Sequence, residues 1–401
     1  MLGVMKILVV NAGSSSHKLS LFDSEGGLPT DSLWRAQLDW GRPDNQYYTV
    51  QVKGGEKVTR HLKTPSLEEG LREVLESLWK GDAPVIDTPL AIGRVGHRVV
   101  HGGAIFQCPV LVTGAVKEEI RRLIPLAPLH NPGNLEGIEL IEQIFPAIPQ
   151  IAVFDTAFHS TMSEVVKTYP LPYEWKEKGI QRYGFHGTSH RYCAIRAAEM
   201  MKSRFSSLRL VNCHLGNGAS LCAIRDGKSV DTTMGFTPLE GLMMGTRCGS
   251  IDPGILLYAM RELNVAPKEL DTLLTFESGL KGIGGSSDMR EIQAQTSERA
   301  ELALNMYIYR LKYFIGAMTA SLGGIDVLSF TAGIGEHAAY IREKTCEGLA
   351  YLGVRLDLEK NHQDKSDQDL DIAASDSAVR ILVIHTQEEW MIAKGCLDAL
   401  L

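Results

Sequence analysis

Two arginines stand out because each lies among glycines. Arg98 lies in the segment GHRVVHGG, residues 96–103, and Arg247 lies in GTRCGS, residues 245–250. A guanidinium group is planar and always charged, and its paired N–H groups match the oxygens of carboxylates and phosphates. Two such side chains can hold a carboxylate and a transferring phosphoryl group. The alternative is that each arginine forms an ordinary structural ion pair.

Among the 12 histidines, His186 is the strongest candidate for chemistry, because Gly187 follows it and a helix is expected directly afterwards. His130, in APLHNP, lines a pocket or caps a turn. His190 is better explained as a residue of the expected helix whose ring nitrogens have ordinary hydrogen-bond partners. Four others rank lower for chemistry: His97, His101, His159 and His214. The sequence has no H-E-x-x-H motif and no Cys/His grouping, so zinc is not expected.

Two acidic residues occupy the ends of expected elements. Asp155 ends a short apolar strand, and Glu388 begins the last helix. A carboxylate, the Asn11 amide and water would suit Mg²⁺, which takes few protein ligands and keeps its waters. The alternative for Glu388 is simple stabilisation of the first helical turn. A G-x-S-x-G motif is absent, which argues against a serine hydrolase.

A polar, glycine-bearing turn follows the first buried strand. Residues 7–10 are Ile-Leu-Val-Val, the turn is NAGSSSHK at 11–18, and a second strand is expected over 19–22. Backbone N–H groups, hydroxyls and the Lys18 ammonium can face phosphate oxygens. The turn is not a Walker loop, because G-x-x-x-x-G-K-[ST] is absent. The alternative is an ordinary hairpin with a polar tip.

The same strand–turn–strand pattern recurs half a chain later, at LGNGAS, residues 215–220. Matching Asn217–Ser220 to Asn11–Ser15 predicts two related halves that clamp a nucleotide between two domains. A third anion or nucleotide site is expected at TAGIGE, residues 331–336, where a strand leads into a helix N-terminus.

The length of 401 residues predicts about two domains. We expect residues 1–154 with 388–401 in the first and 155–387 in the second. The net charge of −7 and the lack of a basic run argue against nucleic-acid binding. Seven scattered cysteines without a C-x-x-C pair indicate reduced thiols. With no signal peptide or membrane-length apolar run, a cytoplasmic protein is expected.

Hydrophobic periodicity predicts the remaining elements. Further strands are expected at 47–52, 87–100, 151–154, 326–330 and 379–384. Helices are expected at 66–80, 115–124, 135–145, from Arg191, and at 388–400, where the last packs back on the first domain. Two long helical segments are expected after residue 254, separated by residues 282–290.

Longer motifs run through the whole chain in a fixed order: NAGSSSHK, VGHRVVHGG, APLHNP, VFDTAFH, YGFHGTSH, HLGNG, MGFTPLEGL, GTRCGSIDP and FTAGIGE. This set resembles the acetate kinases, and the closely similar propionate and butyrate kinases share most of it. The resemblance implies an α/β protein with the duplicated ribonuclease H-like fold of sugar kinases, actin and heat-shock 70-type chaperones. It also implies an active-site cleft between two domains, and a homodimer.

The resemblance implies roles for residues at the matching positions. Arg98 binds the substrate carboxylate, and Asp155 is the essential acid near it. His186 and Arg247 stabilise the phosphoryl group in flight, with His130 nearby. The apolar pocket that receives the methyl group contains Val100, Leu129, Phe185 and Pro238.

The resemblance also implies the metal and nucleotide sites. Asn11 and Glu388 help to hold Mg²⁺, with Mn²⁺ as an alternative, and ATP/ADP is the co-substrate. The residues that face or border the nucleotide are Lys18, His214, Leu215, Gly216, Asn217, Gly218, Asp288, Met289, Arg290, Gly333, Ile334, Gly335, Glu336 and His337. Residues 385–389 read HTQEE where PTNEE is common in the family, so Glu388 and Glu389 both stay candidates for the metal.

The expected reaction is reversible phosphorylation of acetate by ATP, giving acetyl phosphate. An ionised carboxylate is already a nucleophile, so catalysis reduces to alignment and charge stabilisation during direct in-line transfer. Val100, rather than a smaller residue, favours acetate over propionate or another short-chain acid. One methylene is worth only ~1–3 kcal/mol in such a pocket, so propionate kinase is the alternative.

Two other functions are open from the residues alone. An ATP-switched binding protein of the actin or chaperone kind would hydrolyse ATP slowly without any small acid, and would have no use for Arg98 and Arg247 beside an apolar pocket. A sugar kinase would need a carboxylate to take a hydroxyl proton, and Asp155 could serve.

Overall fold

The computed structural model describes residues 5–13, 16–25, 31–39, 46–62, 66–81, 83–363 and 368–399. The chain divides into two compact units, residues 1–157 with 387–401, and residues 158–386. Ser14 and Ser15 of the first turn, and residue 400 of the last expected helix, lie outside the described residues. No helix among the described residues is long and apolar enough to cross a membrane.

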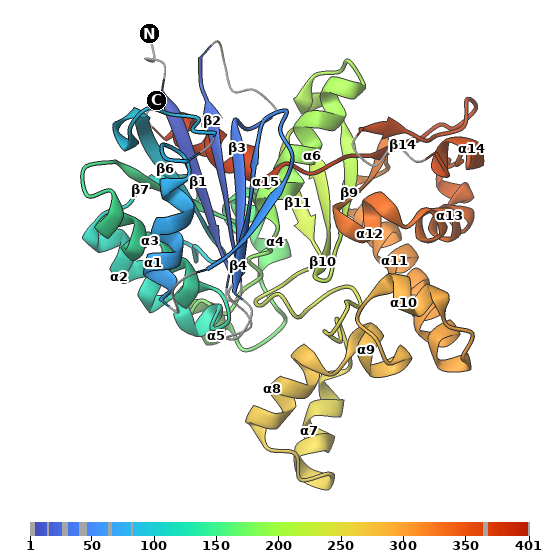
Figure 1. Ribbon diagram of the computed structural model, residues 1–401. Coiled ribbons are helices and arrows are strands. Elements are labelled where there is room, and N and C mark those ends of the chain that lie inside the picture. Colours follow the sequence, from blue (N-terminus) through green and yellow to red (C-terminus); the bar gives the residue numbers. More distant parts are fainter. Residues whose placement is uncertain are drawn as a thin grey trace. The chain divides into compact units, whose positions relative to one another are not determined.

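The first unit is built on one sheet (Figure 1). Its strands are β1 (Lys6–Ala12), β2 (Ser16–Asp23), β3 (Trp34–Asp39), β4 (Tyr47–Val52), β5 (Val58–His61), β6 (Ile92–Val99), β7 (Val110–Leu111) and β8 (Gln150–Phe154). They lie in the order β5-β4-β3-β2-β1-β6-β8-β7. The β1–β2–β3 pairs are antiparallel, whereas β6 runs parallel to both β1 and β8. β3 and β5 were not predicted from the sequence.

Helices cover both faces of this sheet, which explains why its first strand is apolar throughout rather than alternating. The helices are α1 (Leu67–Glu76), α2 (Gly114–Arg122), α3 (Asn131–Ile144) and α15 (Glu388–Asp398). Leu8 of β1 shares a core cluster with Leu71 of α1, whereas Ile7 shares another with Ile392 of α15. A Cβ atom at Gly96 would lie 2.9 Å from Ile392 Cγ2, so glycine permits this close approach. The C-terminal helix therefore packs on the first unit, as predicted.

The second unit repeats the same topology. Its strands are β9 (Arg209–Leu215), β10 (Ala219–Arg225), β11 (Lys228–Thr232), β12 (Val327–Thr331), β13 (Leu370–Asp371) and β14 (Arg380–Val383). They lie in the order β11-β10-β9-β12-β14-β13, with β9, β10 and β11 antiparallel and β12 parallel to both β9 and β14. The series β11-β10-β9-β12-β14 matches β3-β2-β1-β6-β8 in order and direction. The predicted duplicated α/β fold is confirmed.

The helices of the second unit include the long α11, which packs on β10 and β11, and α6, which packs on β9 and β12 (Figure 1). Their bounds are α4 (Glu164–Lys167), α5 (Tyr173–Glu177), α6 (Gly187–Met200), α7 (Pro253–Glu262), α8 (Pro267–Phe276), α9 (Gly279–Gly284), α10 (Met289–Ala294), α11 (Glu298–Leu322), α12 (Ala332–His337), α13 (Ala339–Glu347) and α14 (Leu358–Asn361).

Several predicted boundaries were wrong. α6 begins at Gly187 rather than at Arg191, and α3 begins at Asn131 rather than 135, because Pro132 is tolerated in a first helical turn. The first long segment after residue 254 is three helices, and the break expected at 282–290 is shorter, because α9 ends at Gly284 and α10 begins at Met289.

The predicted match between the two glycine turns also needs correction. Asn11 lies on β1 as its second-to-last residue, whereas Asn217 lies in the turn between β9 and β10. The residue of β9 at the place of Asn11 is His214.

Candidate active site

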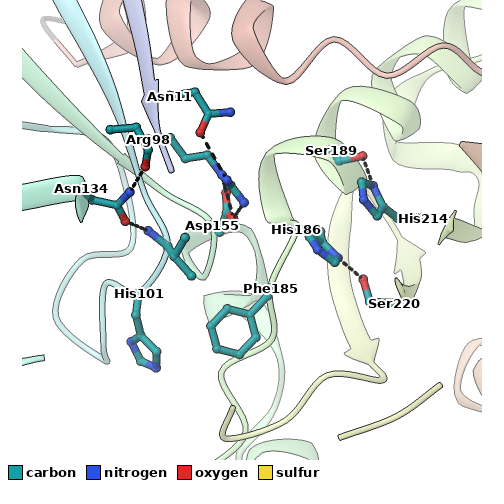
Figure 2. A network of polar contacts seen from close by, with 12 residues as sticks. Asn11, Arg98, His101, Asn134, Asp155, Phe185, His186, Ser189, His214 and Ser220 are labelled. Atoms are coloured by element: carbon teal, nitrogen blue, oxygen red, sulfur yellow. Dashed lines mark hydrogen bonds and ion pairs between the residues drawn. The ribbon is translucent and has the colours of Figure 1, made fainter. Parts of the chain in front are cut away.

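In the first unit, three neighbouring strands bring polar side chains together at one edge of the sheet. Arg98 lies on β6, Asp155 directly follows β8, and Asn11 lies on β1. Arg98 Nη2 donates to Asp155 Oδ2 at 2.5 Å, and Arg98 Nε donates to the same oxygen at 3.0 Å. Arg98 Nη1 donates to Asn11 Oδ1 at 3.3 Å (Figure 2). Because β6 is parallel to both neighbours, their C-terminal ends meet and place these groups side by side.

The charged side chains at this edge, Arg98, Asp155 and Glu388, interact with one another. Burial alone would lower the pKa of Arg98, but the carboxylates of Asp155 and Glu388 raise it above its ordinary value. The Asp155 side chain is only 1% exposed, and the guanidinium balances its charge. Arg98 therefore forms the ion pair that was the alternative hypothesis from the sequence, and this pair fixes the orientation of its guanidinium group.

Glu388 occupies the first turn of α15 beside this pair. Burial raises its pKa to about 7; Arg98 and Lys18 lower it, whereas Asp155 and Glu389 raise it further. Lys18, on β2, is the strand partner of Asn11. A local excess of carboxylate charge in a buried place favours binding of a cation. Among the described residues no group of three or more His, Cys, Asp or Glu side chains is arranged to hold a metal.

Two asparagines of α3 organise the segment that follows β6. Asn134 Oδ1 accepts from the Val100 N–H at 3.0 Å, and Asn134 Nδ2 donates to the Ala12 carbonyl at 2.6 Å (Figure 2). Asn131 Oδ1 accepts from the His101 N–H at 3.1 Å, and its amide donates to the His101 carbonyl. Both asparagines are buried. Sequence reasoning missed them, although the polar run at the start of an apolar helix is a signal for buried hydrogen bonds.

The other predicted substrate residues differ in how far they are buried. Val100 is buried, whereas Leu129 is 45% exposed. His130 is half-buried and lies at the N-cap position of α3. Of the predicted pocket residues in the second unit, Phe185 is buried and Pro238 is half-buried.

In the second unit, His186 lies at the start of α6 in a left-handed conformation, with φ of 56°. Such a conformation is uncommon for a residue other than glycine and is often found at functional sites. His186 Nδ1 lies 2.9 Å from Ser220 Oγ, and its ring stacks on His214 with centroids 4.2 Å apart (Figure 2). His214 Nδ1 lies 2.8 Å from Ser189 Oγ.

Arg247 and His186 converge on the second glycine turn. A Cβ atom at Gly218 would lie 3.3 Å from Arg247 Nη1 and 3.7 Å from His186 Nε2. Glycine also permits the fold of the arginine segment, because a Cβ at Gly245 would lie 2.0 Å from Asn217 Oδ1. The glycines around Arg247 therefore allow the arginine loop and the turn to pack against each other.

The electrostatic setting of Arg247 differs from that of Arg98. Arg247 is half-buried, and burial lowers its pKa. Arg247 Nη1 donates to the Pro238 carbonyl at 3.2 Å. In the described part of the chain, Arg247 forms no ion pair with a carboxylate. A buried guanidinium that no carboxylate balances is a candidate anion-binding group.

A cavity of about 480 Å³ in the second unit gathers most of the predicted nucleotide residues. It is lined by Gly216, Asn217, Ser287, Asp288, Met289, Arg290, Gln293, Gly333, Ile334, His337 and Ala338. Ser287, Gln293 and Ala338 were not predicted. Glu336 does not line it, because its carboxylate turns to its own loop and accepts from the Ala332 N–H at 2.7 Å. His214 and Leu215 are buried on β9, beside the cavity's glycine turn.

Comparisons with known proteins show the family of this chain. A model of the Acetokinase family matches residues 6–394. The chain belongs to the acetokinase family. It is 62% identical to the acetate kinase of Protochlamydia amoebophila, over 98% of this chain and 99% of that protein. It is 54% identical to the acetate kinase of Rippkaea orientalis, over 98% of both chains.

Solved structures of the acetokinase family give the same result. The crystal structure of Porphyromonas gingivalis acetate kinase superposes with a TM-score of 0.91 at 41% identity, covering 99% of this chain and 100% of that one. A propionate kinase from Francisella tularensis superposes with a TM-score of 0.88 at 39% identity, covering 98% of both. The resemblance seen in the motifs and the predicted fold class are confirmed. An actin-like or sugar-kinase assignment is therefore not retained.

Proposed function

We propose that this acetokinase-family enzyme catalyses the reversible, ATP-dependent phosphorylation of acetate to acetyl phosphate. The observation that carries the proposal is the position of Arg247, a half-buried guanidinium beside His186 and a glycine turn, with no carboxylate ion pair among the described residues. A phosphoryl group in transfer carries the charge that such a site would balance.

The proposed step is a single in-line displacement. A carboxylate oxygen of acetate forms a bond to the γ-phosphorus of ATP, while the bond from that phosphorus to the bridging oxygen of ADP breaks. No proton moves, so no general base is needed, and the enzyme contributes alignment and charge stabilisation. Arg98, oriented by Asp155, binds the carboxylate. Arg247 and His186 bind the transferring phosphoryl group.

The cavity of about 480 Å³ in the second unit supports binding of the nucleotide. Its lining combines Gly216 and Asn217 of one glycine segment and Gly333 and Ile334 of another with the helix-capping Asp288. Backbone N–H groups of glycine turns can approach phosphates closely, and a cavity of this size suits a nucleoside. We assign ATP and ADP to it.

We assign a divalent metal to Asn11 and Glu388 in the first unit. The donors are oxygens, and the raised pKa of Glu388 reflects a site where another positive charge would stabilise the ionised carboxylate. When bound, Mg²⁺ or Mn²⁺ would neutralise charge on the phosphates during transfer. Between the two adjacent glutamates, Glu388 is favoured because its charge is coupled to Arg98, Asp155 and Lys18.

The choice of acid is proposed as acetate, with propionate kinase as the second candidate. Val100 is buried and held through its backbone by Asn134, so its side chain has a fixed place in the proposed pocket. Acetate kinases are 62% and 54% identical to this chain, and a propionate kinase is among the matching structures.

The test is ATP-dependent formation of acyl phosphate, trapped as the hydroxamate, with acetate, propionate and butyrate compared side by side. Preference for acetate supports the proposal as stated. Preference for propionate keeps the mechanism and replaces the substrate. ATP hydrolysis without any trapped product would contradict the kinase assignment.

We further propose a cytoplasmic homodimer. The helices α7 and α8 pack together and expose large apolar side chains, which include Ile255, Leu257, Tyr258, Leu263, Leu273 and Phe276. Clustered apolar exposure of this kind is typical of protein interfaces. Sedimentation of the full chain tests the assembly, and a monomer at micromolar concentration would contradict it.

A further inference from the structure

A chain of buried polar side chains continues inward from His186. Ser220 Oγ lies 2.9 Å from His186 Nδ1 and 2.8 Å from His190 Nε2. Asn212 Nδ2 lies 2.8 Å from His190 Nδ1, and Ser329 Oγ donates to Asn212 Oδ1 at 2.6 Å. Apart from His186, every member of this chain has no exposed surface. None of the inner members was expected to take part in chemistry.

Rigid elements hold this chain in place. His186 and His190 lie one helical turn apart at the start of α6, and Ser220 lies on β10. Asn212 and Ser329 are direct strand partners in the parallel pair of β9 and β12. The distances are therefore set by the central sheet and by the helix that packs on it, rather than by a loop.

The single hydroxyl hydrogen of Ser220 couples the tautomers of the two histidines. Ser220 can donate to one imidazole only and must accept from the other. Burial lowers the pKa of His190 well below its ordinary value, so this ring is neutral and carries one N–H. A hydrogen on His190 Nε2 therefore requires an unprotonated His186 Nδ1. Conversely, a hydrogen on His186 Nδ1 requires an unprotonated His190 Nε2.

The Asn212 amide selects one of these two states. In the structure, Asn212 Oδ1 faces Ser329 Oγ, which donates to it, and the Asn212 NH₂ group faces His190 Nδ1 and donates to it. His190 then carries its hydrogen on Nε2 and donates to Ser220. Ser220 in turn donates to His186 Nδ1, which leaves the His186 hydrogen on Nε2.

We propose that Asn212 is a positioning residue that fixes, through His190 and Ser220, the tautomer in which His186 Nε2 carries a hydrogen. Nε2 is the nitrogen next to Gly218, where Arg247 also converges. At this position, an N–H group at His186 Nε2 donates to a phosphoryl oxygen, whereas the lone pair of an unprotonated Nε2 would repel that oxygen. This inference rests on the proposed phosphoryl transfer.

The direct test is ¹⁵N NMR of the full chain labelled at histidine, without ligands, at neutral pH. Nitrogen shifts distinguish protonated from unprotonated ring nitrogens, and His186→Gln and His190→Gln variants assign the signals. We expect an N–H at Nε2 and an unprotonated Nδ1 in both rings. A hydrogen on His186 Nδ1, alone or together with one on Nε2, would overturn the inference.

Kinetics test the positioning role. Ser220→Ala breaks the chain between the two histidines, and we expect kcat to fall about 3- to 10-fold, as for one lost hydrogen bond, with an unchanged KM for ATP. The matched control is Ser229→Ala, because Ser229 is equally buried and lies 2.9 Å from His159 Nδ1 outside this chain. Equal kcat losses in both variants would show a general packing effect and refute the positioning role.

A second variant keeps the inference testable if Ser220→Ala does not fold. Ser329→Ala removes the donor that orients the Asn212 amide, so we expect His190 Nδ1 to become partly protonated in the NMR experiment. An unchanged His190 tautomer would refute the role of the amide. Failure of the proposed function would look different, because the wild-type chain would then form no acyl phosphate whichever tautomer His186 adopts.

Discussion

Replacing Arg98 by alanine should lower the stability of the protein, whereas replacing Arg247 by alanine should lower kcat and leave stability nearly unchanged. Both variants lose a guanidinium that we assign to substrate or phosphoryl binding. However, Arg98 balances the buried carboxylate of Asp155 at 2.5 Å, whereas Arg247 forms no ion pair in the part of the chain that the structure describes. Arg98→Ala therefore removes one side of a stabilising ion pair, whereas Arg247→Ala removes a positive charge that no carboxylate balances.

The expected magnitudes follow from these contacts. Arg98→Ala removes the guanidinium that balances the Asp155 carboxylate, whose side chain is only 1% exposed, and breaking such a buried ion pair costs about 3–5 kcal/mol. Arg247→Ala removes a guanidinium whose pKa is lowered by burial, so its loss should leave stability unchanged or slightly raised. Loss of one donor to a developing oxyanion costs roughly 10²–10³-fold in kcat, which sets the expectation for Arg247→Ala.

The assay combines urea denaturation at pH 7 with hydroxamate kinetics on the same preparations. Arg98→Ala should unfold at a clearly lower urea concentration, and the double variant Arg98→Ala/Asp155→Ala should recover part of that loss. Arg247→Ala should unfold with the wild-type midpoint and have a much lower kcat. Near-normal turnover in Arg247→Ala, or a destabilisation equal to that of Arg98→Ala, would refute the reasoning.

Three further predictions concern the acid pocket, the metal and pH. Val100→Ala should raise the propionate-to-acetate ratio of kcat/KM by about tenfold, the worth of a methylene in an apolar pocket; an unchanged ratio would remove Val100 from it. Glu388→Gln should raise the Mg²⁺ concentration for half-maximal activity far more than the neighbouring Glu389→Gln, and the opposite order would reassign the ligand. His97 is buried against Gln150, and burial lowers its pKa from 6.5 to about 4. The unfolded chain thus binds the extra proton first, so stability should be full above pH 7 and fall by up to about 3 kcal/mol as pH drops from 6.5 towards 4. Equal urea midpoints at pH 7 and pH 5 would contradict this.

Local patterns were sufficient to predict most strands and the glycine turns. The run Ile-Leu-Val-Val at 7–10 is buried on both faces, and TAGIGE at 331–336 does join a strand to a helix. The start of α6 was missed because His186 adopts a left-handed conformation that only the surrounding packing can impose. No propensity scale assigns that conformation to histidine in advance.

The supporting side chains could not be predicted, because their partners are remote in sequence. Asn134 donates to the Ala12 carbonyl across 122 positions, and Ser329 donates to Asn212 across 117. Motif reasoning proposes the groups that would face a ligand, because chemistry dictates their types. It could not identify buried hydrogen-bonding partners, because any polar residue is equally suited until the fold brings it into place.

The duplicated topology explains how the two units come to do different work. Asn11 and His214 are both the second-to-last residue of the first strand of their sheet, in β1 and β9. In the β1–β6 register, which pairs Val10 with His97, Arg98 comes next to Asn11, whereas the β12 partner of His214 is Thr331. Where the first unit places a guanidinium in a cluster rich in carboxylates, the second has the buried hydroxyl of Thr331, which donates to the Ile384 carbonyl. The guanidinium of the second unit, Arg247, is supplied by a loop that follows β11 and has no carboxylate partner among the described residues. We therefore propose that the same edge binds a cation and an acid in the first unit, and phosphate in the second.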